Sequence, residues 1–489
     1  MNLMQINTRH GNFRHIAFMT PPTVLASETQ PTEALLRQFD VPGPRYTSYP
    51  TADRFVEAFT ALDYRQALWS RANGVGTVGG FSPLSVYVHV PFCESVCYYC
   101  ACNKVITKHH ERAAEYLDVL EREIALHAEV LGSGQMVSQL HLGGGSPTFL
   151  NDDELSRLMA SLRSVFRLAP GAEVSIEVDP RTVTSVRLKH LSDLGFNRLS
   201  FGVQDFDPAV QHAIHRVQSE QLVEELMRQA RALGFVSTNV DLIYGLPQQT
   251  PASLERTIGK VSALRPDRIA LYGYAHLPHR FKPQRRIDAA TLPPAADKIK
   301  MLSTAILGFE QAGYRYIGMD HFALPTDSLA VAKRQGRLHR NFQGYSTQPD
   351  CDLIGLGVSS IGRVGATYSQ NAKTLPEYYD AVRQGQFPVV RGMALTRDDL
   401  VRRAVIMALM CQGRVEYESI TLSHLIDTPH YFAKELLQLQ ALQEQGLVVL
   451  EPGAVQLTPL GWYFVRAVAM VFDRHLQVDK TRERFSRII

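Results

Sequence analysis

Six short apolar runs between residues 86 and 274 constrain the fold most, because enough chain separates each run from the next to form a helix. The runs are rich in β-branched residues, which favour strands. One gap contains Glu115–His127, where Leu117, Leu120 and Ile124 recur at helical spacing. Parallel strands joined by helices predict an α/β fold with its site at the carboxyl ends of the strands. The predicted strands are Val86–Val90, Val137–Leu142, Val174–Asp179, Leu199–Gln204, Val240–Tyr244 and Ile269–Tyr274.

Four of these strands have one apolar face and one polar face. In Val174–Asp179, for example, the aliphatic side chains alternate with Ser175, Glu177 and Asp179. A fully packed parallel barrel would be apolar on both faces of its strands. The alternation therefore predicts an open or incomplete barrel around a polar ligand. The same alternation on the other three strands gives a polar side that contains Tyr87, His89, Ser200, Gln204, Asn239 and Asp241.

Four of the six cysteines lie within ten residues, and three of them have the spacing Cys93-x3-Cys97-x2-Cys100. Iron–sulfur clusters are held by Cys thiolates, normally one per iron, so three thiolates leave one iron of a [4Fe–4S] cluster open to another ligand. A structural zinc site would use four ligands, usually as two separated pairs. The loop therefore favours a catalytic cluster, and a zinc-binding structural protein is an alternative.

A glycine run, Gly143–Gly145, follows the second predicted strand. Glycines let a backbone approach a ligand closely, although they also serve tight turns. The two common phosphate-binding patterns, GxGxxG and GxxxxGK[ST], are absent at this position. Beside a cysteine loop, the backbone groups of this run could hold the amino and carboxylate ends of a small zwitterion.

Composition narrows the class of protein. The chain has 489 residues, 45% of them hydrophobic, and can bury a large core. A net charge of +3 argues against nucleic-acid binding, and no apolar run is long enough to span a membrane. Cys351 and Cys411 stand alone in the sequence, so a disulfide framework is not expected and a reducing compartment fits. We expect a monomer in the cytoplasm.

The chain divides into four expected parts. Residues 1–35 lack periodicity and contain no signal-peptide core, so we expect a disordered extension. Residues 36–80 would form an N-terminal arm or lid, residues 81–365 the catalytic barrel, and residues 366–489 a mostly helical domain. In that domain, helices at 400–410, 432–445 and 460–476 and a hairpin at 446–457 suggest a winged-helix-like module. We favour a packing role over DNA binding, since the presumed recognition helix carries few basic residues.

The cysteine loop and the glycine run together resemble the radical S-adenosylmethionine (SAM) superfamily. Further segments, from about residue 36 to the C-terminus, narrow the resemblance to the oxygen-independent coproporphyrinogen III oxidase family. This resemblance implies a partial (β/α)6 barrel and a heme-biosynthetic enzyme. Such an enzyme uses a 5′-deoxyadenosyl radical to convert two propionates of coproporphyrinogen III to the vinyls of protoporphyrinogen IX. The segments are Gly43–Thr51, Cys102, Ile176–Arg181, Gly202–Phe206, Asp241–Pro247, Tyr274–Pro278, Gly318–Phe322, His339–Tyr345 and Phe485–Ile489.

Residue by residue, the resemblance implies a [4Fe–4S] cluster on Cys93, Cys97 and Cys100 and two bound SAM molecules. The family pattern has Phe where this chain has Tyr99 and Thr where it has Ser146, and both changes keep the relevant chemistry. Cys102 stays outside the cluster, because three thiolates and SAM satisfy the four irons. The electron donor and acceptor are not identified. The cluster-bound SAM would contact Tyr87, Gly144, Glu177 and Ile361. The second SAM would contact Tyr99, Gly145, Ser146, Gln204, Arg216, Asp241 and Ala275.

A related heme-binding chaperone is the main alternative to the enzyme. Its members keep the three-cysteine loop but lack the Gly43–Thr51 arm and the Cys102 position, and this chain has both. Arg45, in the arm, is a candidate partner for a substrate propionate. We expect His321, His339 and Arg340 to belong to structural hydrogen-bond networks.

Overall fold

The computed structural model describes residues 30–75, 82–348 and 350–478, and the chain from Pro31 onward forms one compact unit. Most of the expected N-terminal extension and the Phe485–Ile489 motif lie outside the described residues. Helix α1 (Glu33–Gln38) begins inside the segment expected to be disordered, because the Thr32 hydroxyl accepts the Leu35 N–H and caps the helix. The expected extension therefore ends before Glu33.

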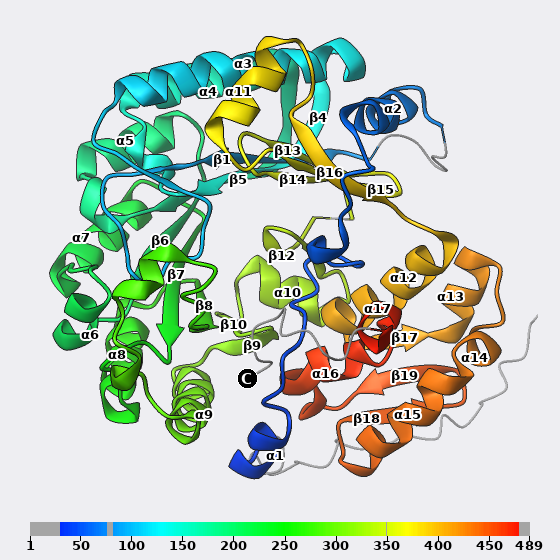
Figure 1. Cartoon of the computed structure of the whole chain (residues 1–489). Coiled ribbons are helices and arrows are strands. Elements are labelled where there is room, and N and C mark those ends of the chain that lie inside the picture. Colours follow the sequence, from blue (N-terminus) through cyan, green and yellow to red (C-terminus); the bar gives the residue numbers. More distant parts are fainter. Residues whose placement is uncertain (1–29, 76–81, 349, 479–489) are drawn as a thin grey trace, which may run out of the picture. The chain divides into compact units, whose positions relative to one another are not determined.

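A twelve-stranded sheet forms the core, in the order β16-β15-β14-β13-β1-β4-β5-β6-β7-β8-β10-β9 (Figure 1). All six predicted strands are present in it, and each pairs in parallel with its neighbour among the six. The two ends of this order, β16 and β9, do not pair among the described residues. The fold is thus α/β with a partial barrel. The six strands are β1 (Leu84–Val90), β4 (Gln135–Gly144), β5 (Phe166–Val178), β6 (Arg198–Gln204), β7 (Ser237–Tyr244) and β8 (Arg268–Gly273).

The sheet also contains strands that the sequence did not predict. At one end, β13 (Leu353–Leu356) pairs in parallel with β1, and three antiparallel strands extend the sheet to Ala394. These strands are short, and the clear apolar alternation of the six central strands is weak in them. The expected domain boundary at residue 365 falls between β14 and β15, so the sheet continues past it. The further strands are β14 (Ile361–Val364), β15 (Thr367–Asn371), β16 (Val389–Ala394), β10 (His321–Ala323) and β9 (Arg315–Gly318).

Helices cover the outer face of the sheet (Figure 1). The predicted helix Glu115–His127 lies within α3 (Glu111–Leu131), whose Leu120 and Ile124 join the core that contains Val86 and Val88 of β1. The apolar faces of the strands are thereby buried against helices, and their polar faces point to the interior of the barrel. The other outer helices are α4 (Asp152–Val165), α5 (Ser185–Asp193), α7 (Glu220–Ala232), α8 (Pro251–Leu264) and α9 (Ala295–Gln311).

The C-terminal segment contains two of the three predicted helices and the predicted hairpin. Helices α12 (Arg397–Gln412) and α15 (Ala433–Glu444) and the antiparallel pair β18 (Val448–Glu451) and β19 (Ala454–Leu457) confirm this part of the prediction. A third strand, β17 (Arg414–Glu416), pairs with β19.

The single helix expected over residues 460–476 is wrong. The chain instead forms a 3-10 turn followed by α16 (Val465–Met470) and α17 (Arg474–Val478). The break falls at Asp473, whose carboxylate accepts the backbone N–H groups of His475 and Leu476 and so starts a new helix.

The N-terminal arm is held by the C-terminal segment. The Tyr46 hydroxyl donates to Asp473 at 3.0 Å, and the Arg466 guanidinium donates to the backbone oxygen of Pro44 at 2.9 Å. Tyr46 and Tyr49 have no exposed surface. The arm is therefore part of the packed core, and it carries Arg45 between two fixed neighbours.

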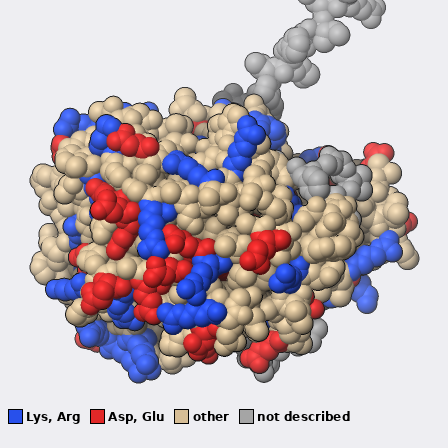
Figure 2. All heavy atoms as spheres, turned by 90° about the horizontal axis from the view of Figure 1, so that it is seen from above, with Lys and Arg blue, Asp and Glu red and all other residues tan. Residues whose placement is uncertain are grey.

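The surface mixes both signs of charge. Figure 2 shows acidic and basic side chains interspersed over the described residues of one face, without a continuous basic field there. Across the described ranges, no helix has both the length and the apolarity needed to cross a membrane.

Candidate active site

A cavity of about 530 Å³ lies at the carboxyl ends of strands β4 to β7, and the cysteine loop forms one side of it. Strand ends of a parallel sheet are the usual place for a site, because the loops that follow them converge there. The cavity brings together eleven of the fourteen predicted site residues. These are Cys93, Cys97, Tyr99, Cys100, Gly144, Gly145, Ser146, Glu177, Gln204, Arg216 and Asp241.

Two of the three remaining residues, Tyr87 and Ile361, lie on other strands of the same sheet. Tyr87 stacks on the ring of His141, with the two ring centres 5.9 Å apart. Tyr87 is paired in register with Gly355, and a Cβ on Gly355 would lie 2.6 Å from the backbone oxygen of Ile361. Ile361, on β14, is thus two strands from Tyr87 in the sheet order and is outside the lining of the cavity.

The third residue, Ala275, is connected to the cavity by a side-chain amide. Gln284 is buried, and its Nε2 donates to the backbone oxygens of Ala275 and Tyr99 at 3.2 and 3.0 Å. Burial raises the pKa of the Tyr99 hydroxyl well above its usual range, so Tyr99 stays neutral at the cavity wall. The segment after β8 is thereby fixed against the cysteine loop.

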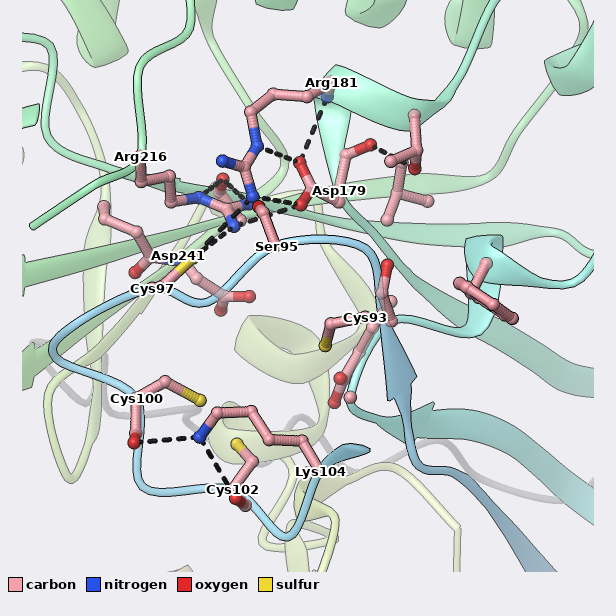
Figure 3. A pocket seen from close by; sticks show the side chains of 18 of the residues that line it. Cys93, Ser95, Cys97, Cys100, Cys102, Lys104, Asp179, Arg181, Arg216 and Asp241 are labelled. Atoms are coloured by element: carbon pink, nitrogen blue, oxygen red, sulfur yellow. Dashed lines mark hydrogen bonds and ion pairs between the residues drawn. The ribbon is translucent and has the colours of Figure 1, made fainter. Parts of the chain in front are cut away.

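The three cysteines of the loop surround open space. Figure 3 shows the sulfur atoms of Cys93 and Cys100 facing the cavity, and Cys97 beside Arg216. Burial raises the pKa of Cys93 to about 12, and the neighbouring Cys100 and Cys97 add to the shift. A hydrogen bond with Cys102 and the ammonium of Lys104 lower the pKa of Cys100 to about 6, against the effect of burial.

The donor set fits a cluster of several irons. Thiolates crowded on one loop repel one another, and bound iron cations relieve this repulsion. No group of three or more His, Cys, Asp or Glu side chains in the described parts of the chain is arranged to hold a single metal ion. The sulfur atoms instead border a space large enough for a cluster, and the loop leaves its other side open to the polar strand ends.

Two arginines and one carboxylate fix the far side of the loop. Asp179 accepts hydrogen bonds from Arg181 at 2.7 Å and from Arg216 at 3.2 Å. Burial alone would raise the pKa of Asp179, but the two guanidiniums lower it, so the carboxylate is charged. Both arginines also donate to the Cys97 sulfur, at 3.7 and 3.5 Å. This network orients Cys97 through the end of strand β5.

The glycine run is packed too tightly for other residues. A Cβ on Gly145 would lie 2.6 Å from the backbone oxygen of Pro91, and one on Gly143 would lie 2.8 Å from Oε1 of Glu177. Gly144 has a φ of +118°, which side-chain-bearing residues rarely adopt. Its N–H donates to Oε2 of Glu177 at 3.2 Å. The run thus holds Glu177 in place with its carboxylate at the cavity.

Asp241 lines the cavity and is held by two neighbouring side chains. It accepts hydrogen bonds from the Ser200 hydroxyl at 2.8 Å and from the Asn239 amide at 2.9 Å. Burial raises the pKa of Asp241 to about 6, although these hydrogen bonds lower it. Both partners belong to the polar strand faces that the sequence alternation identified.

Some residues of the site received no role from the sequence. Arg181 and Asp179 belong to the Ile176–Arg181 segment, and the position of Asp179 on a polar strand face was the available signal. Lys104, which donates to the backbone oxygens of Cys100 and Cys102, carried no pattern that could single it out. A lysine near a cysteine loop becomes informative only once the loop is folded.

Residues 87–261 match the family model described as the radical SAM superfamily, and residues 395–464 match the HemN C-terminal domain. The chain is 47% identical over 456 residues to the oxygen-independent coproporphyrinogen III oxidase of Escherichia coli (strain K12), covering 93% of this chain and 98% of that protein. The chain belongs to the oxygen-independent coproporphyrinogen III oxidase family. Another family member, from Pseudomonas aeruginosa, is 47% identical over 458 residues, again 93% of this chain and 98% of that protein.

A solved structure of the family agrees with the fold. The structure titled "Coproporphyrinogen III oxidase (HemN) from Escherichia coli is a Radical SAM enzyme" has a TM-score of 0.85 and 47% identity, and covers 91% of this chain and 98% of that one. Membership of this family makes the protein a radical SAM oxidoreductase and implies a [4Fe–4S] cluster and SAM. The zinc-binding alternative is thereby excluded.

Proposed function

We propose that the protein converts coproporphyrinogen III to protoporphyrinogen IX without oxygen. The cavity carries this proposal, because it brings the three-thiol loop, the glycine run and the polar strand ends to one space. Cys93, Cys97 and Cys100 would hold a [4Fe–4S] cluster, which with SAM would supply the radical chemistry needed to remove a hydrogen atom from the propionate carbon next to the ring. Release of CO2 and transfer of one electron to an acceptor of unassigned identity would then leave a vinyl group, and the change would occur at two propionates.

In this proposal Cys93, Cys97 and Cys100 hold three irons and leave the fourth open to SAM. Their positions around the cavity support the assignment, as does the orientation of Cys97 by two arginines. Cys102 is exposed and stays outside the cluster. Its hydrogen bond to Cys100 adjusts that thiol and does not add a ligand.

The SAM at the open iron would contact Tyr87, Gly144, Glu177 and Ile361. The carboxylate of Glu177 is an acceptor for an amino group, and its link to the Gly144 N–H keeps it at the cavity. Burial raises the pKa of Tyr87 well above its usual range, so Tyr87 remains a neutral partner beside that carboxylate. These groups suit the amino acid end of SAM.

A second SAM molecule would occupy the other side of the cavity. Arg216 and Asp241 lie there with opposite charges, which suits a ligand that carries both signs. Glycine at position 145 and the Ser146 hydroxyl provide close backbone approach and a hydrogen-bond partner. The full set is Tyr99, Gly145, Ser146, Gln204, Arg216, Asp241 and Ala275.

We also propose the division of the chain into an arm (36–80), a catalytic barrel and a C-terminal domain. Sheet pairing to Ala394 supports a boundary near that residue in place of 365. We also propose a monomer in the cytoplasm, and the six free cysteines support that compartment. An electron donor of unassigned identity must reduce the cluster.

The test is anaerobic incubation of the reconstituted protein with SAM, a reductant and coproporphyrinogen III. We expect protoporphyrinogen IX with one CO2 released for each vinyl formed, and 5′-deoxyadenosine formed in step. A brown protein that absorbs near 400 nm (roughly, as iron–sulfur clusters do) shows that the cluster is loaded. Heme binding without either product would favour the chaperone alternative, against which the Gly43–Thr51 arm and Cys102 argue.

A further inference from the structure

Arg340 lies in β11 (His339–Asn341), and its buried side chain has no hydrogen-bond partner among the described residues. It is 5% exposed, and its Nε and Nη1 atoms are enclosed and make no hydrogen bond. Its guanidinium lies over the ring of Tyr345, 4.6 Å from the ring centre. Buried charges in proteins are normally paired with an opposite charge. Among the described residues, Arg340 has no such partner, which marks the position as prepared for an anion.

A row of three aromatic rings connects Arg340 to a second arginine. The rings of Tyr345 and His321 meet edge to face with centres 5.6 Å apart, and those of His321 and Tyr272 do so at 5.9 Å. The guanidinium of Arg45 lies over Tyr272, 5.3 Å from the ring centre. We call Tyr272, His321 and Tyr345 the aromatic wall. The guanidinium of Arg340 lies over the Tyr345 end of the aromatic wall, and that of Arg45 lies over the Tyr272 end.

The aromatic wall lines a second cavity of about 170 Å³. This smaller cavity adjoins the larger one, because Glu177, Ser200, Asp241 and Tyr272 line both. No cysteine lines the smaller cavity. A molecule in the barrel can therefore reach the aromatic wall while its reacting part remains near the cysteine loop.

Arg340 carries most of the available positive charge at the aromatic wall. Burial and the nearby guanidiniums lower the pKa of His321 to about 3, so this ring is neutral. Its Nδ1 donates to the backbone oxygen of Met319 at 2.7 Å. Arg45 is paired with Asp320 at 3.4 Å, so part of its charge is already compensated.

We propose that Arg340, assisted by Arg45, binds a carboxylate of the tetrapyrrole substrate at the aromatic wall. This inference rests on the proposed function, whose substrate carries four propionates. A guanidinium matches a carboxylate in shape and charge, and the surrounding rings exclude water and strengthen the pair.

The bound carboxylate is one that does not react in that turnover. A carboxylate loses its charge when it leaves as CO2, so a cation beside it would stabilise the ground state more than the transition state. Binding a remote carboxylate favours the reaction instead. It positions the reacting propionate without stabilising the charge that this propionate must lose. The absence of cysteines from the smaller cavity agrees with such a remote position.

The decisive variant is Arg340→Met in the reconstituted holoenzyme. Coproporphyrin III, the oxidised tetracarboxylate, serves as a fluorescent binding probe, and KM is measured for coproporphyrinogen III. We expect the Kd and the KM to rise at least tenfold (roughly the effect of losing one charge-assisted hydrogen bond). Melting temperature should be unchanged or higher, because methionine replaces an unpaired buried charge. A structural role predicts a lower melting temperature instead.

Arg71→Met is the matched control. Arg71 is 6% exposed but pairs with Asp352 and donates to the backbone oxygen of Ser82 at 2.6 Å. Its replacement leaves the Asp352 carboxylate with the Gly365 N–H but without its charged partner, so the melting temperature should fall while the Kd for coproporphyrin III stays unchanged. Arg340→Lys, which keeps the charge, should recover part of the affinity. If Arg340→Met does not fold, Arg45→Gln tests the same site and should weaken binding by a few-fold.

Several results would overturn the inference. An unchanged Kd in Arg340→Met, or in Arg45→Gln where the first variant does not fold, excludes the carboxylate site. An equal loss of affinity for the tetramethyl ester of coproporphyrin III shows that the contact is not with a carboxylate. Loss of SAM cleavage in the absence of substrate assigns the contact to the carboxylate of SAM. If the wild-type enzyme forms no protoporphyrinogen IX, the proposed function fails, whereas the coproporphyrin titration still decides the role of Arg340.

Discussion

Arg216 and Arg340 are similarly buried, but their guanidiniums have different partners. Arg216 donates to Asp179, to the Cys97 sulfur and to the backbone oxygen of Gly202. Within the described ranges, the guanidinium of Arg340 has only the ring of Tyr345 as a partner. The side of the site that holds the cysteine loop thus satisfies its own charges, whereas the aromatic wall leaves one charge for the substrate.

This difference has a physical reason. Removing one member of a buried ion pair costs about 3–5 kcal/mol, so the network around Asp179 is a permanent part of the fold. A buried charge without a partner lowers stability until an anion arrives. The protein therefore keeps the cofactor side rigid before any ligand binds, and the substrate side gains its last electrostatic partner on binding.

The largest effect is expected on the cofactor side. Cys93→Ser removes one thiolate of the loop, and serine is a poor ligand for iron, so cluster and activity should be lost together. Iron content, absorbance near 400 nm (roughly) and 5′-deoxyadenosine formation measure this. Cys93→Ser should lose the cluster, whereas Arg340→Met should keep its full cluster content and lose affinity for the substrate. Cluster retention with normal turnover in Cys93→Ser would refute the ligand assignment.

Asp179→Asn tests the permanence of the arginine network. The change leaves Arg181 and Arg216 without a carboxylate, and the free energy of unfolding should fall by about 3 kcal/mol. Denaturant unfolding of the apoprotein measures it. Asp207→Asn is the control, because Asp207 also caps a helix but pairs with the largely exposed Arg256, and the expected loss is at most about 1 kcal/mol. Equal losses would remove the distinction between buried and exposed pairs.

The sequence predicted the cofactor side better than the substrate side. Strand alternation placed Glu177, Gln204 and Asp241 on polar faces, and the cysteine spacing identified the loop, because both patterns are local. Of the fourteen site residues that the family resemblance implied, eleven line the cavity. Local periodicity and spacing are sufficient where a parallel sheet brings strand ends together.

The aromatic wall was not predicted, because its parts come from distant segments. Arg45 lies in the arm, Tyr272 in β8 and Arg340 in a short hairpin, and only tertiary packing brings them together. We expected Arg340 to belong to a structural network, and the enclosed, unpartnered Nε and Nη1 atoms contradict this. Missing partners are visible only in three dimensions. The short strands β13 to β16 were missed for a related reason, since their pairing depends on distant neighbours.

Asp241 lines both cavities, and the pH dependence of protein stability tests whether its carboxylate is buried there. The folded pKa is raised from 3.8 to about 6, so the folded apoprotein holds a proton that the unfolded chain releases in that window. The stability that the protonated Asp241 adds to the free energy of unfolding is fully present below pH 3.8 and is lost as the pH rises to about 6. Asp241→Asn should therefore become more stable than the wild type, by up to about 3 kcal/mol above pH 6, and equal to it near pH 4.

Urea unfolding of both proteins between pH 4 and 8 measures this difference. Asp179→Asn provides the opposite sign, because the pKa of Asp179 is lowered and its contribution is lost as the pH falls. A constant difference between Asp241→Asn and the wild type across the range would show that the Asp241 carboxylate is not held in a desolvated position. Asp241, which lines both cavities, would then titrate like a solvent-exposed carboxylate.

The smallest expected effect concerns the competition between Asp320 and the substrate for Arg45. Asp320→Asn removes the paired carboxylate, and asparagine tolerates the φ of +67° at this position. Because a partly exposed pair is worth up to about 1 kcal/mol, the Kd for coproporphyrin III should fall by at most about fivefold. The gain should vanish when Arg45→Gln is also present, since the two changes act through one contact. Weaker binding in Asp320→Asn would mean that Asp320 positions Arg45 for the substrate carboxylate. Arg45 would then be held by a permanent carboxylate partner, as Arg216 is by Asp179, and Arg340 alone would lack one.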